Sequence, residues 1–313
     1  MAIGTRGSPL ALAQAHTVAG LIPMARPGAA PPTIKPMRTA GDVLIDKPLA
    51  AFGGKGLFTR ELDDALLADA VDLAVHSMKD VPTTLPAGIV IAAVLPREDI
   101  RDVFVTADRS TLAALPEGAR VGTSSLRRRA QVLARRPDLE VVEFRGNVNT
   151  RIDKIRRGVA DATILARAGL NRLGIEADEL GVTLDVTDML PAPAQGAIGI
   201  ACREDDEALR ALLAKLNDPV TDRAIACERA LLAALDGSCR TPIAAFARDE
   251  GGRLILDALI AEPDGGAIFR TRREGAARDA EAMGGDAGAE LRDRAGADFF
   301  ARLNARYADI VRT

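Results

Sequence analysis

The chain contains 313 residues, more than the roughly 250 to 300 residues at which a single hydrophobic core stops growing. Its 48% hydrophobic and 27% charged residues are typical of a globular protein and exclude a disordered or fibrous one. Because 41 Lys and Arg residues nearly balance 44 Asp and Glu residues, any cationic site must come from local clustering. We therefore expect two or three domains and no nucleic-acid partner.

The cysteine and apolar patterns exclude further classes of protein. Cys202, Cys227 and Cys239 form no C-x-x-C pair, and only two histidines accompany them, so we expect no metal site. An odd, low cysteine count also argues against a disulfide scaffold and favours a reducing compartment. The longest apolar stretch, residues 89–95, is far shorter than the roughly 20 residues of a membrane helix. These patterns predict a cytoplasmic protein without a membrane partner.

Two parts of the chain repeat one local order of elements. Residues 2–5 are expected to form a strand, and Ser8 and Pro9 then provide the cap and first turn of a helix. The sequence VGTSSL at 121–126, followed by a basic helix, has the same strand, turn and helix order. Further strands are expected at 72–77, 88–95, 141–144 and 162–166. Strands that alternate with helices predict two similar α/β domains with mostly parallel sheets.

The remaining chain has a different pattern. A strand at 197–202 and a helix at 207–216 are expected to return to the first domain. A helix at 221–235 and later hairpin turns predict a small α+β domain that ends with a helix near Tyr307, and the Ala/Gly-rich residues 275–289 predict a loose connection. The expected domains are residues 1–96 with 197–216, residues 97–196, and residues 217–313.

Three turns before expected helices carry arginine. Unpaired N–H groups at a helix N-terminus attract anions, and the arginine fork suits carboxylates. One such turn usually means a capped helix beside a solvated arginine, but three at the carboxyl edge of α/β sheets favour a multiply anionic ligand. The residues at these turns are Arg6 and Ser8, then Thr123, Ser124, Ser125, Arg127 and Arg128, and then Arg145 and Arg151.

Two other basic stretches suggest alternative functions. The run 127–129 is compatible with a nucleic-acid patch, but the chain has only nine aromatic residues and none lies within the run to stack on bases. The GGKG sequence at 53–56 lacks the upstream glycine and the Ser or Thr of a phosphate-binding loop. A flexible lid that carries one cation, Lys55, is the simpler interpretation.

Two short segments contain groups suited to catalysis. His76, Ser77, Lys79 and Asp80 gather at the end of an expected strand, where a surface turn and a proton-handling carboxylate are both compatible with the sequence. Cys239 lies in a loop, whereas Cys202 and Cys227 fall on an apolar strand and in a helix, as buried structural thiols do. Cys239 is therefore the candidate for a covalent role.

Taken in order, these motifs closely resemble the porphobilinogen deaminase family, also called the hydroxymethylbilane synthase family. The resemblance reaches from near the N-terminus into the third expected domain, and AVHSMKDVPT together with GTSSLRR is highly specific. The matching stretches are TRGSPLAL (5–12), GGKGLF (53–58), DLAVHSMKDVPT (72–83), VGTSSLRRRAQ (121–131), FRGNVNTR (144–151), AGLNRLG (168–174), PAPAQGAIGI (191–200) and GSCRTPI (237–243).

The resemblance implies a transferase that joins four porphobilinogen molecules head to tail, with release of ammonia, into hydroxymethylbilane in haem biosynthesis. It implies a dipyrromethane cofactor held by a thioether to Cys239. The implied fold is α/β, with two domains like those of periplasmic binding proteins and a small α+β C-terminal domain. A monomer is the state that the family implies.

The resemblance also implies the site residues. The essential aspartate corresponds to Asp80. The implied cofactor-binding residues are Cys239, Lys79, Ser77, Thr123, Ser125, Arg127, Arg128 and Arg145. The implied substrate-binding residues are Arg6, Ser8, Lys55, Arg151, Arg172 and Gln195. The chemistry agrees, because every pyrrole carries an acetate and a propionate, and loss of ammonia leaves an azafulvene cation that a carboxylate stabilises.

Two residues depart from the family pattern, and one other function remains in view. Many relatives have lysine at Ala51 and glycine at Ser238, so lid closure and the geometry of the cysteine loop are less firmly implied. The alternative function is a two-lobed binding protein for a small anion, without catalytic activity. A secretory signal would favour that alternative, but Gln14 and His16 interrupt the apolar run near the N-terminus.

Overall fold

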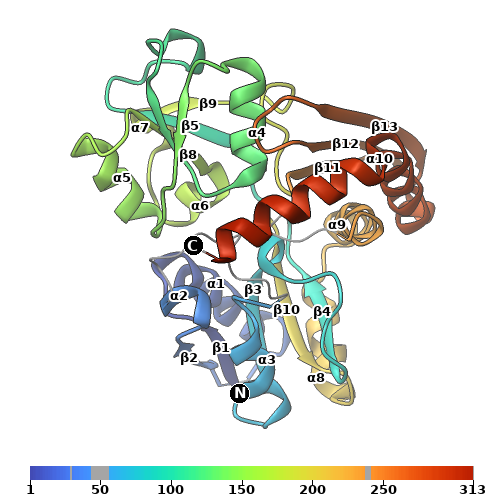
Figure 1. Cartoon of the computed structure of the whole chain (residues 1–313). Coiled ribbons are helices and arrows are strands. Elements are labelled where there is room, and N and C mark those ends of the chain that lie inside the picture. The colour runs from blue at the N-terminus through green and yellow to red at the C-terminus, as the bar shows by residue number, and fades with distance from the viewer. Residues whose placement is uncertain (29, 44–55, 237–240, 313) are drawn as a thin grey trace. The chain divides into compact units, whose positions relative to one another are not determined.

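The computed structural model describes residues 1–28, 30–43, 56–236 and 241–312 (Figure 1). These residues form two units, each with its own internal contacts. The first unit contains the described residues up to Glu98 together with Gln195–Arg223, and the second contains Asp99–Ala194 together with the described residues from Ala224 onward. The division into three domains stays a prediction.

The first unit is built on a five-stranded sheet. Its strands are β1 (Ala2–Arg6), β2 (Thr33–Met37), β3 (Leu73–Ser77), β4 (Ile89–Val94) and β10 (Ile198–Arg203), in the spatial order β2-β1-β3-β10-β4. β1 runs parallel to β2 and β3, whereas β10 runs antiparallel to β3 and β4. β10, which follows residues 99–194 of the second unit, thus belongs to the first sheet, as expected.

Helices of the first unit pack against this sheet. The first is α1 (Pro9–Ala25), which Ser8 caps by accepting a hydrogen bond from the Ala11 amide at 3.3 Å. Its buried face packs with β1 and β3 in one apolar core. The other helices are α2 (Ala40–Val43), α3 (Arg60–Leu67), the short η2 turn (Met78–Asp80), α8 (Glu207–Leu213) and η4 (Ala214–Leu216).

The second unit contains a sheet of the same design. Its strands are β5 (Asp102–Thr106), β6 (Arg120–Gly122), β7 (Glu140–Val142), β8 (Ala162–Ala166) and β9 (Gly181–Thr183), in the order β7-β6-β8-β5-β9. β6 is parallel to β7 and β8, and β5 is antiparallel to β8 and β9. Both sheets therefore share one pattern of strand directions, which confirms the expected similarity of the two α/β parts.

The expectation of mostly parallel sheets is confirmed, because four of the five strands in each sheet run in one direction and the exceptions are β10 in the first sheet and β5 in the second. β5 begins shortly after the chain leaves the first unit, and β10 begins shortly after it leaves the second. Neither strand is joined to its sheet through a βαβ unit, the connection that makes neighbouring strands parallel.

Four helices and one short turn complete the α/β part of the second unit. α4 (Leu126–Arg135) and α5 (Val148–Arg156) follow β6 and β7, and each begins after a capping side chain. α6 (Arg167–Arg172) follows β8 directly. The remaining pieces are η3 (Leu112–Ala114) and α7 (Ala177–Leu180).

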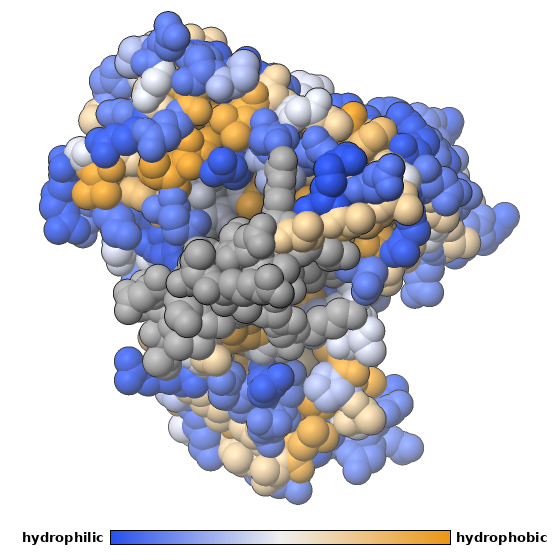
Figure 2. Space-filling model, in the orientation of Figure 1, coloured by the Kyte–Doolittle hydropathy of each residue, from blue (hydrophilic) through white to orange (hydrophobic). Residues whose placement is uncertain are grey.

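The C-terminal part of the second unit is a small α+β layer, as expected. α9 (Pro219–Ala234) precedes an antiparallel meander of β11 (Ile243–Glu250), β12 (Arg253–Ala261) and β13 (Ile268–Ala276). α10 (Ala280–Arg312) follows the short η5 turn (Ala277–Asp279) and contacts β13 and β12. The surface of this part is largely hydrophilic on the face shown in Figure 2, in keeping with ion pairs such as that between Arg273 and Asp286.

The Ala/Gly-rich stretch 275–289 is not a loose connection, because it ends β13 and begins α10. Its glycines allow close helix packing. A Cβ atom added at Gly284 would lie 2.0 Å from the carbonyl oxygen of Cys227 on α9, and one added at Gly288 would lie 2.6 Å from the Cβ of Ala234. α10 also continues past the expected end near Tyr307, with a kink at Gly296.

Candidate functional site

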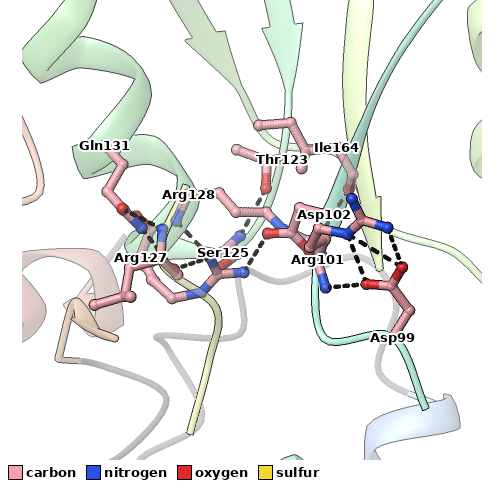
Figure 3. Close-up of polar contacts among 10 residues, drawn as sticks. Asp99, Arg101, Asp102, Thr123, Ser125, Arg127, Arg128, Gln131 and Ile164 are labelled. Carbon is pink, nitrogen blue, oxygen red and sulfur yellow. Dashed lines mark hydrogen bonds and ion pairs between the residues drawn. The ribbon is translucent and has the colours of Figure 1, made fainter. Parts of the chain in front are cut away.

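The N-terminus of α4 forms a polar corner of the second unit (Figure 3). The Oγ atom of Ser125 accepts a hydrogen bond from the Arg128 amide at 3.4 Å, and the Oγ1 atom of Thr123 accepts one from the Ser125 amide at 3.1 Å. The predicted helix cap is therefore present. Arg127 and Arg128 follow on the first turn of the helix, and both are buried.

Asp102, at the start of β5, binds both of these guanidinium groups (Figure 3). Arg128 donates from Nε and Nη2 to the two carboxylate oxygens at 3.1 and 2.8 Å, and Arg127 donates from Nη2 at 2.8 Å. Burial alone would raise the pKa of the Asp102 carboxyl, but the two guanidiniums hold that pKa well below its usual range. Asp102 therefore remains ionised in the folded protein.

Arg127 and Arg128 also donate hydrogen bonds to main-chain carbonyl groups. Arg127 donates from Nη1 to the Leu190 carbonyl at 2.7 Å, and Arg128 donates from Nη1 to the Ile164 carbonyl at 2.8 Å. Burial lowers the pKa of Arg127, and its buried Nε atom has no hydrogen-bond partner. Two buried guanidiniums share one carboxylate, so this corner retains positive charge that an anion would offset.

The N-terminus of α5 adds further cations to the same corner. Asn147 caps this helix by accepting a hydrogen bond from the Thr150 amide at 2.9 Å, and Arg151 donates from Nε to the Gly146 carbonyl at 2.9 Å. Burial, together with the positive charges of Arg128 and Arg145, lowers the pKa of Arg151 to about 10. The arginines of the two turns therefore lie near enough for their charges to act on one another.

Two predicted substrate-binding residues, Arg172 and Gln195, belong to different units. Arg172 ends α6 in the second unit and is partly buried. Gln195 is buried in the first unit, where its carbonyl accepts a hydrogen bond from Nε of Arg97 at 2.9 Å.

A second cluster surrounds Asp80 in the first unit. Asp80 ends the η2 turn after β3, and its Oδ2 atom lies 3.8 Å from Nη1 of Arg6. Arg6 is held by the Asp42 carboxylate and lies over the Phe58 ring, with its central carbon 4.3 Å from the ring centroid. Burial would raise the pKa of Asp42, but hydrogen bonds from Arg6 and Thr39 lower it.

The neighbours of Asp80 are held by different contacts. Ser77 and the buried Gln14 amide lie within hydrogen-bond distance, with Oγ 2.9 Å from Nε2. Burial and the nearby charge of Arg6 lower the pKa of His76 to about 4, so its imidazole is neutral at pH 7. Lys79 is exposed, and the Oγ atom of Ser8 is engaged in capping α1.

The predicted cofactor cysteine, Cys239, and the predicted lid cation, Lys55, lie outside the described residues, as do Ala51 and Ser238. The other two cysteines are buried, as expected. Burial raises the pKa of the Cys202 thiol to about 11 and that of the Cys227 thiol to about 12, which makes both poor nucleophiles.

Sequence reasoning missed the residues that hold the arginines and Ser77 in place. Asp102 is the clearest case, and one signal was available: it is an acidic residue that opens the largely apolar run DVFVT. Asp42, Gln14 and Phe58 carry no comparable signal, because their partners lie at distant positions in the sequence. Among the described residues, no group of three or more His, Cys, Asp or Glu side chains is placed to hold a metal ion.

The architecture defines an α/β protein, and buried arginines gather at the N-terminus of α4 in its second unit. Two family models match the chain: the dipyrromethane cofactor-binding domain of porphobilinogen deaminase over residues 1–211, and the C-terminal domain of porphobilinogen deaminase over residues 223–293. The chain therefore belongs to the porphobilinogen deaminase family, which confirms the resemblance seen in the sequence.

Curated relatives agree over nearly the whole chain. The porphobilinogen deaminase of Nitrobacter winogradskyi is 54% identical over 299 residues, which cover 95% of this chain and 94% of that protein. The chloroplastic porphobilinogen deaminase of Oryza sativa is 52% identical and covers 96% of this chain and 86% of that protein. A periplasmic binding protein of Salmonella typhimurium is a similar solved structure at 14% identity, with a TM-score of 0.38 and coverage of 71% and 93%.

Proposed function

We propose that the protein joins four porphobilinogen molecules head to tail, with release of one ammonia at each step, and that hydrolysis by one water then releases the four-ring chain as hydroxymethylbilane. The observation that carries this proposal is the match of the family models to residues 1–211 and 223–293. The excess of buried guanidinium groups near the N-terminus of α4 supports it, since each pyrrole unit brings two carboxylates. No observation favours a binding protein without activity.

The residues of the second unit fit a dipyrromethane cofactor. Arg127 and Arg128 share the single carboxylate of Asp102, the Nε atom of Arg127 has no hydrogen-bond partner, and burial lowers the pKa of Arg151, so an anion bound here would be stabilised. Arg127, Arg128, Arg145 and Arg151 would bind the carboxylates of the cofactor, with Thr123 and Ser125 shaping the turn. When bound through a thioether to Cys239, the cofactor supplies the pyrrole carbon to which the first substrate is joined.

The carboxylate of Asp80 carries the chemical step in this proposal. Each condensation breaks the C–N bond of the aminomethyl group, forms a C–C bond to the terminal pyrrole, and removes one proton from that ring carbon. The ammonia leaves as the substrate pyrrole becomes cationic, and a fixed negative charge near that ring stabilises the cation. Asp80 also accepts the ring proton, so charge and protons balance at one carboxylate.

The residues around Asp80 prepare the same step. Asp42 fixes one edge of the Arg6 guanidinium, so Arg6 is oriented before a substrate carboxylate arrives. Ser8, Ser77, Lys55, Lys79, Arg172 and Gln195 complete the proposed set that contacts substrate or cofactor. We further propose a cytoplasmic monomer of three domains that uses no nucleic-acid partner. The described residues include no helix long and apolar enough to cross a membrane.

Intact mass and product analysis test the function. The purified protein is expected to carry an adduct of two linked pyrrole units and to convert porphobilinogen into hydroxymethylbilane, with one ammonia released per substrate consumed. A protein that has the unmodified mass, binds small carboxylates and releases no ammonia would instead be an anion-binding protein.

A further inference from the structure

Two main-chain amide groups of α2 are bound by α3 and the turn before it, all within the first unit. The Gly41 amide donates to the Leu57 carbonyl at 3.1 Å, and the Ala40 amide donates to Oε1 of Glu61 at 2.8 Å. The packing is equally close, because a Cβ atom added at Gly41 would lie 2.2 Å from Cε1 of Phe58. The position of α2 is therefore set by the start of α3 and the turn that leads into it.

The same two segments hold Arg6 beside Asp80. Asp42 of α2 accepts hydrogen bonds from Nε and Nη2 of Arg6, the first at 3.3 Å, and the centroid of the Phe58 ring lies 4.3 Å from the central carbon of that guanidinium. Thr39, whose exposed fraction is 0%, donates from its hydroxyl to Oδ2 of Asp42 at 2.8 Å. The Nη1 atom of Arg6 then lies 3.8 Å from the Asp80 carboxylate. A shift of α2 would move Asp42 and, with it, the guanidinium that faces Asp80.

Glu61 binds α2 through one oxygen and leaves the other without a partner. Its Oε2 atom is buried and has no hydrogen-bond partner among the residues that the structure describes. A buried oxygen without a partner lowers stability, so its retention calls for a reason beyond folding. Asp63 also lies in the first turn of α3 and already supplies an acidic group that complements the helix dipole. The contact with the Ala40 amide is what Glu61 adds.

We propose that Glu61 is a positioning residue for the condensation, because it fixes α2 and, through Asp42, keeps Arg6 oriented beside Asp80. This inference rests on the proposed function and adds to it a residue that acts through other side chains. Arg6 is proposed to bind a substrate carboxylate, and a guanidinium that is already oriented loses less conformational freedom when the substrate arrives. Without the Glu61 contact, that ordering would have to occur on binding, so substrate capture would weaken while the chemistry at Asp80 stayed the same.

The test compares Glu61→Met with Asp64→Met in the full-length, cofactor-loaded protein. Both substitutions remove one carboxylate from α3, but Asp64 is exposed, so its variant is the matched control for the loss of charge. Intact mass confirms that the cofactor is loaded, and urea unfolding compares the global stability of the variants. Hydrogen exchange is followed at the Ala40 amide, and kcat and KM for porphobilinogen are measured.

Glu61→Met is expected to speed exchange of the Ala40 amide by about tenfold relative to Asp64→Met, because that amide loses its acceptor. It should lower kcat/KM by about tenfold, chiefly by raising KM, and leave kcat within about threefold. Glu61→Gln keeps an acceptor for the Ala40 amide and should recover most of both losses. Ala40→Pro removes the donor instead, at the first position of a helix, where proline is tolerated, and should reproduce the loss of kcat/KM.

A double-mutant cycle separates this role from a general loss of structure. Asp42→Asn should itself lower kcat/KM, because Arg6 then loses its charged anchor. Adding Glu61→Met to Asp42→Asn should lower kcat/KM by less than about twofold more, since the two residues act along one route. A Glu61 that serves only folding would give its full loss in either background.

Four outcomes would overturn the inference. Exchange of the Ala40 amide equal to that of Asp64→Met means that Glu61 does not hold α2, and faster exchange with the control's kcat/KM means that the contact does not serve the reaction. A full loss in the Asp42→Asn background means that Glu61 acts by another route, and a Glu61→Gln variant no better than Glu61→Met removes the hydrogen bond as the cause.

Two further results are also decisive. If Glu61→Met does not fold, Ala40→Pro with the wild-type kcat/KM overturns the inference in its place. A wild-type protein without turnover refutes the proposed function instead, and exchange of the Ala40 amide then shows on its own whether Glu61 holds α2.

Discussion

The Nη1 atom of Arg6 lies 3.8 Å from the Oδ2 atom of Asp80, beyond hydrogen-bond distance, while the same guanidinium is bound through two nitrogens to Asp42. Arg6 is therefore anchored by one carboxylate and only approaches the other. The Asp80 side chain remains 31% exposed. A carboxylate that is oriented by a nearby cation and still reachable suits the stabilisation of charge on a bound substrate.

Replacing the charge of Asp80 is expected to stop turnover. Asp80→Asn keeps the shape of the side chain but removes the negative charge that the cationic transition state requires. Turnover should collapse, whereas cofactor attachment is expected to survive. Single-turnover reactions with porphobilinogen, followed by mass spectrometry, measure this, and elongation by Asp80→Asn at the wild-type rate would place the essential carboxylate elsewhere.

The substitution Asp80→Glu tests whether the position of the carboxylate matters as well as its charge. Asp80→Glu retains the carboxylate but displaces it by about one methylene, and a displacement of about 1 Å can reduce a rate about 100-fold. We expect a small residual rate, above that of Asp80→Asn and far below wild type. Equal rates for the two variants would show that the charge itself contributes little.

Cys239→Ala is expected to yield protein without bound pyrrole and without activity. The other two thiols are buried, with pKa values raised to about 11 and about 12, and so cannot substitute for it. Peptide mapping of wild-type protein locates the adduct, and an adduct on Cys202 or Cys227 would contradict the assignment. The cysteine variant should also unfold at a lower temperature, because a ligand that binds only the folded state stabilises it.

Local signals in the sequence predicted much of the fold. Ser8 and Pro9 marked the start of α1, and Ser125 marked the start of α4, because a helix cap depends only on neighbouring residues. The antiparallel directions of β5 and β10 escaped prediction, since they depend on how the chain passes between units. Gly284 and Gly288 indicated flexibility when read alone, but their role is set by the surface of α9.

The candidate site shows the same limit. Motifs located Arg127 and Arg128, but they did not reveal that both arginines bind Asp102 in a buried cluster. Asp102 is more than twenty residues away along the chain, and no local pattern connects it with α4. The expected ligand role of the two arginines therefore stays a prediction that must be weighed against their structural contacts.

Leucine substitutions of two arginines should have different effects because their burial differs. Arg127→Leu leaves Asp102 with one partner fewer and Leu190 without its guanidinium contact, and breaking a buried pair costs about 3 to 5 kcal/mol of unfolding free energy. Arg145 is only partly buried, so Arg145→Leu should weaken cofactor assembly with a much smaller loss of stability. Urea unfolding and intact mass measure the two effects, and equal losses of stability would contradict this distinction.

The buried histidine predicts how stability depends on pH. The folded protein lowers the pKa of His76 to about 4 from an ordinary value of 6.5, chiefly through burial. Between these two values the unfolded chain binds the proton and the folded chain does not, so stability is lost as the pH falls from about 6.5 towards about 4, by up to about 1.4 kcal/mol per pH unit. Urea unfolding at several pH values measures this slope, and His76→Gln should flatten it.

Asp63 has the opposite effect on the pH dependence of stability, so a variant at this position is a control for His76→Gln. Burial raises its pKa to about 6 from 3.8, so the folded chain holds a proton that the unfolded chain releases, and Asp63 adds stability as the pH falls through the same range. Asp63→Asn should therefore make the loss below pH 6.5 steeper, whereas His76→Gln makes it shallower. Parallel pH curves for wild type and both variants would mean that neither group changes its pKa on folding.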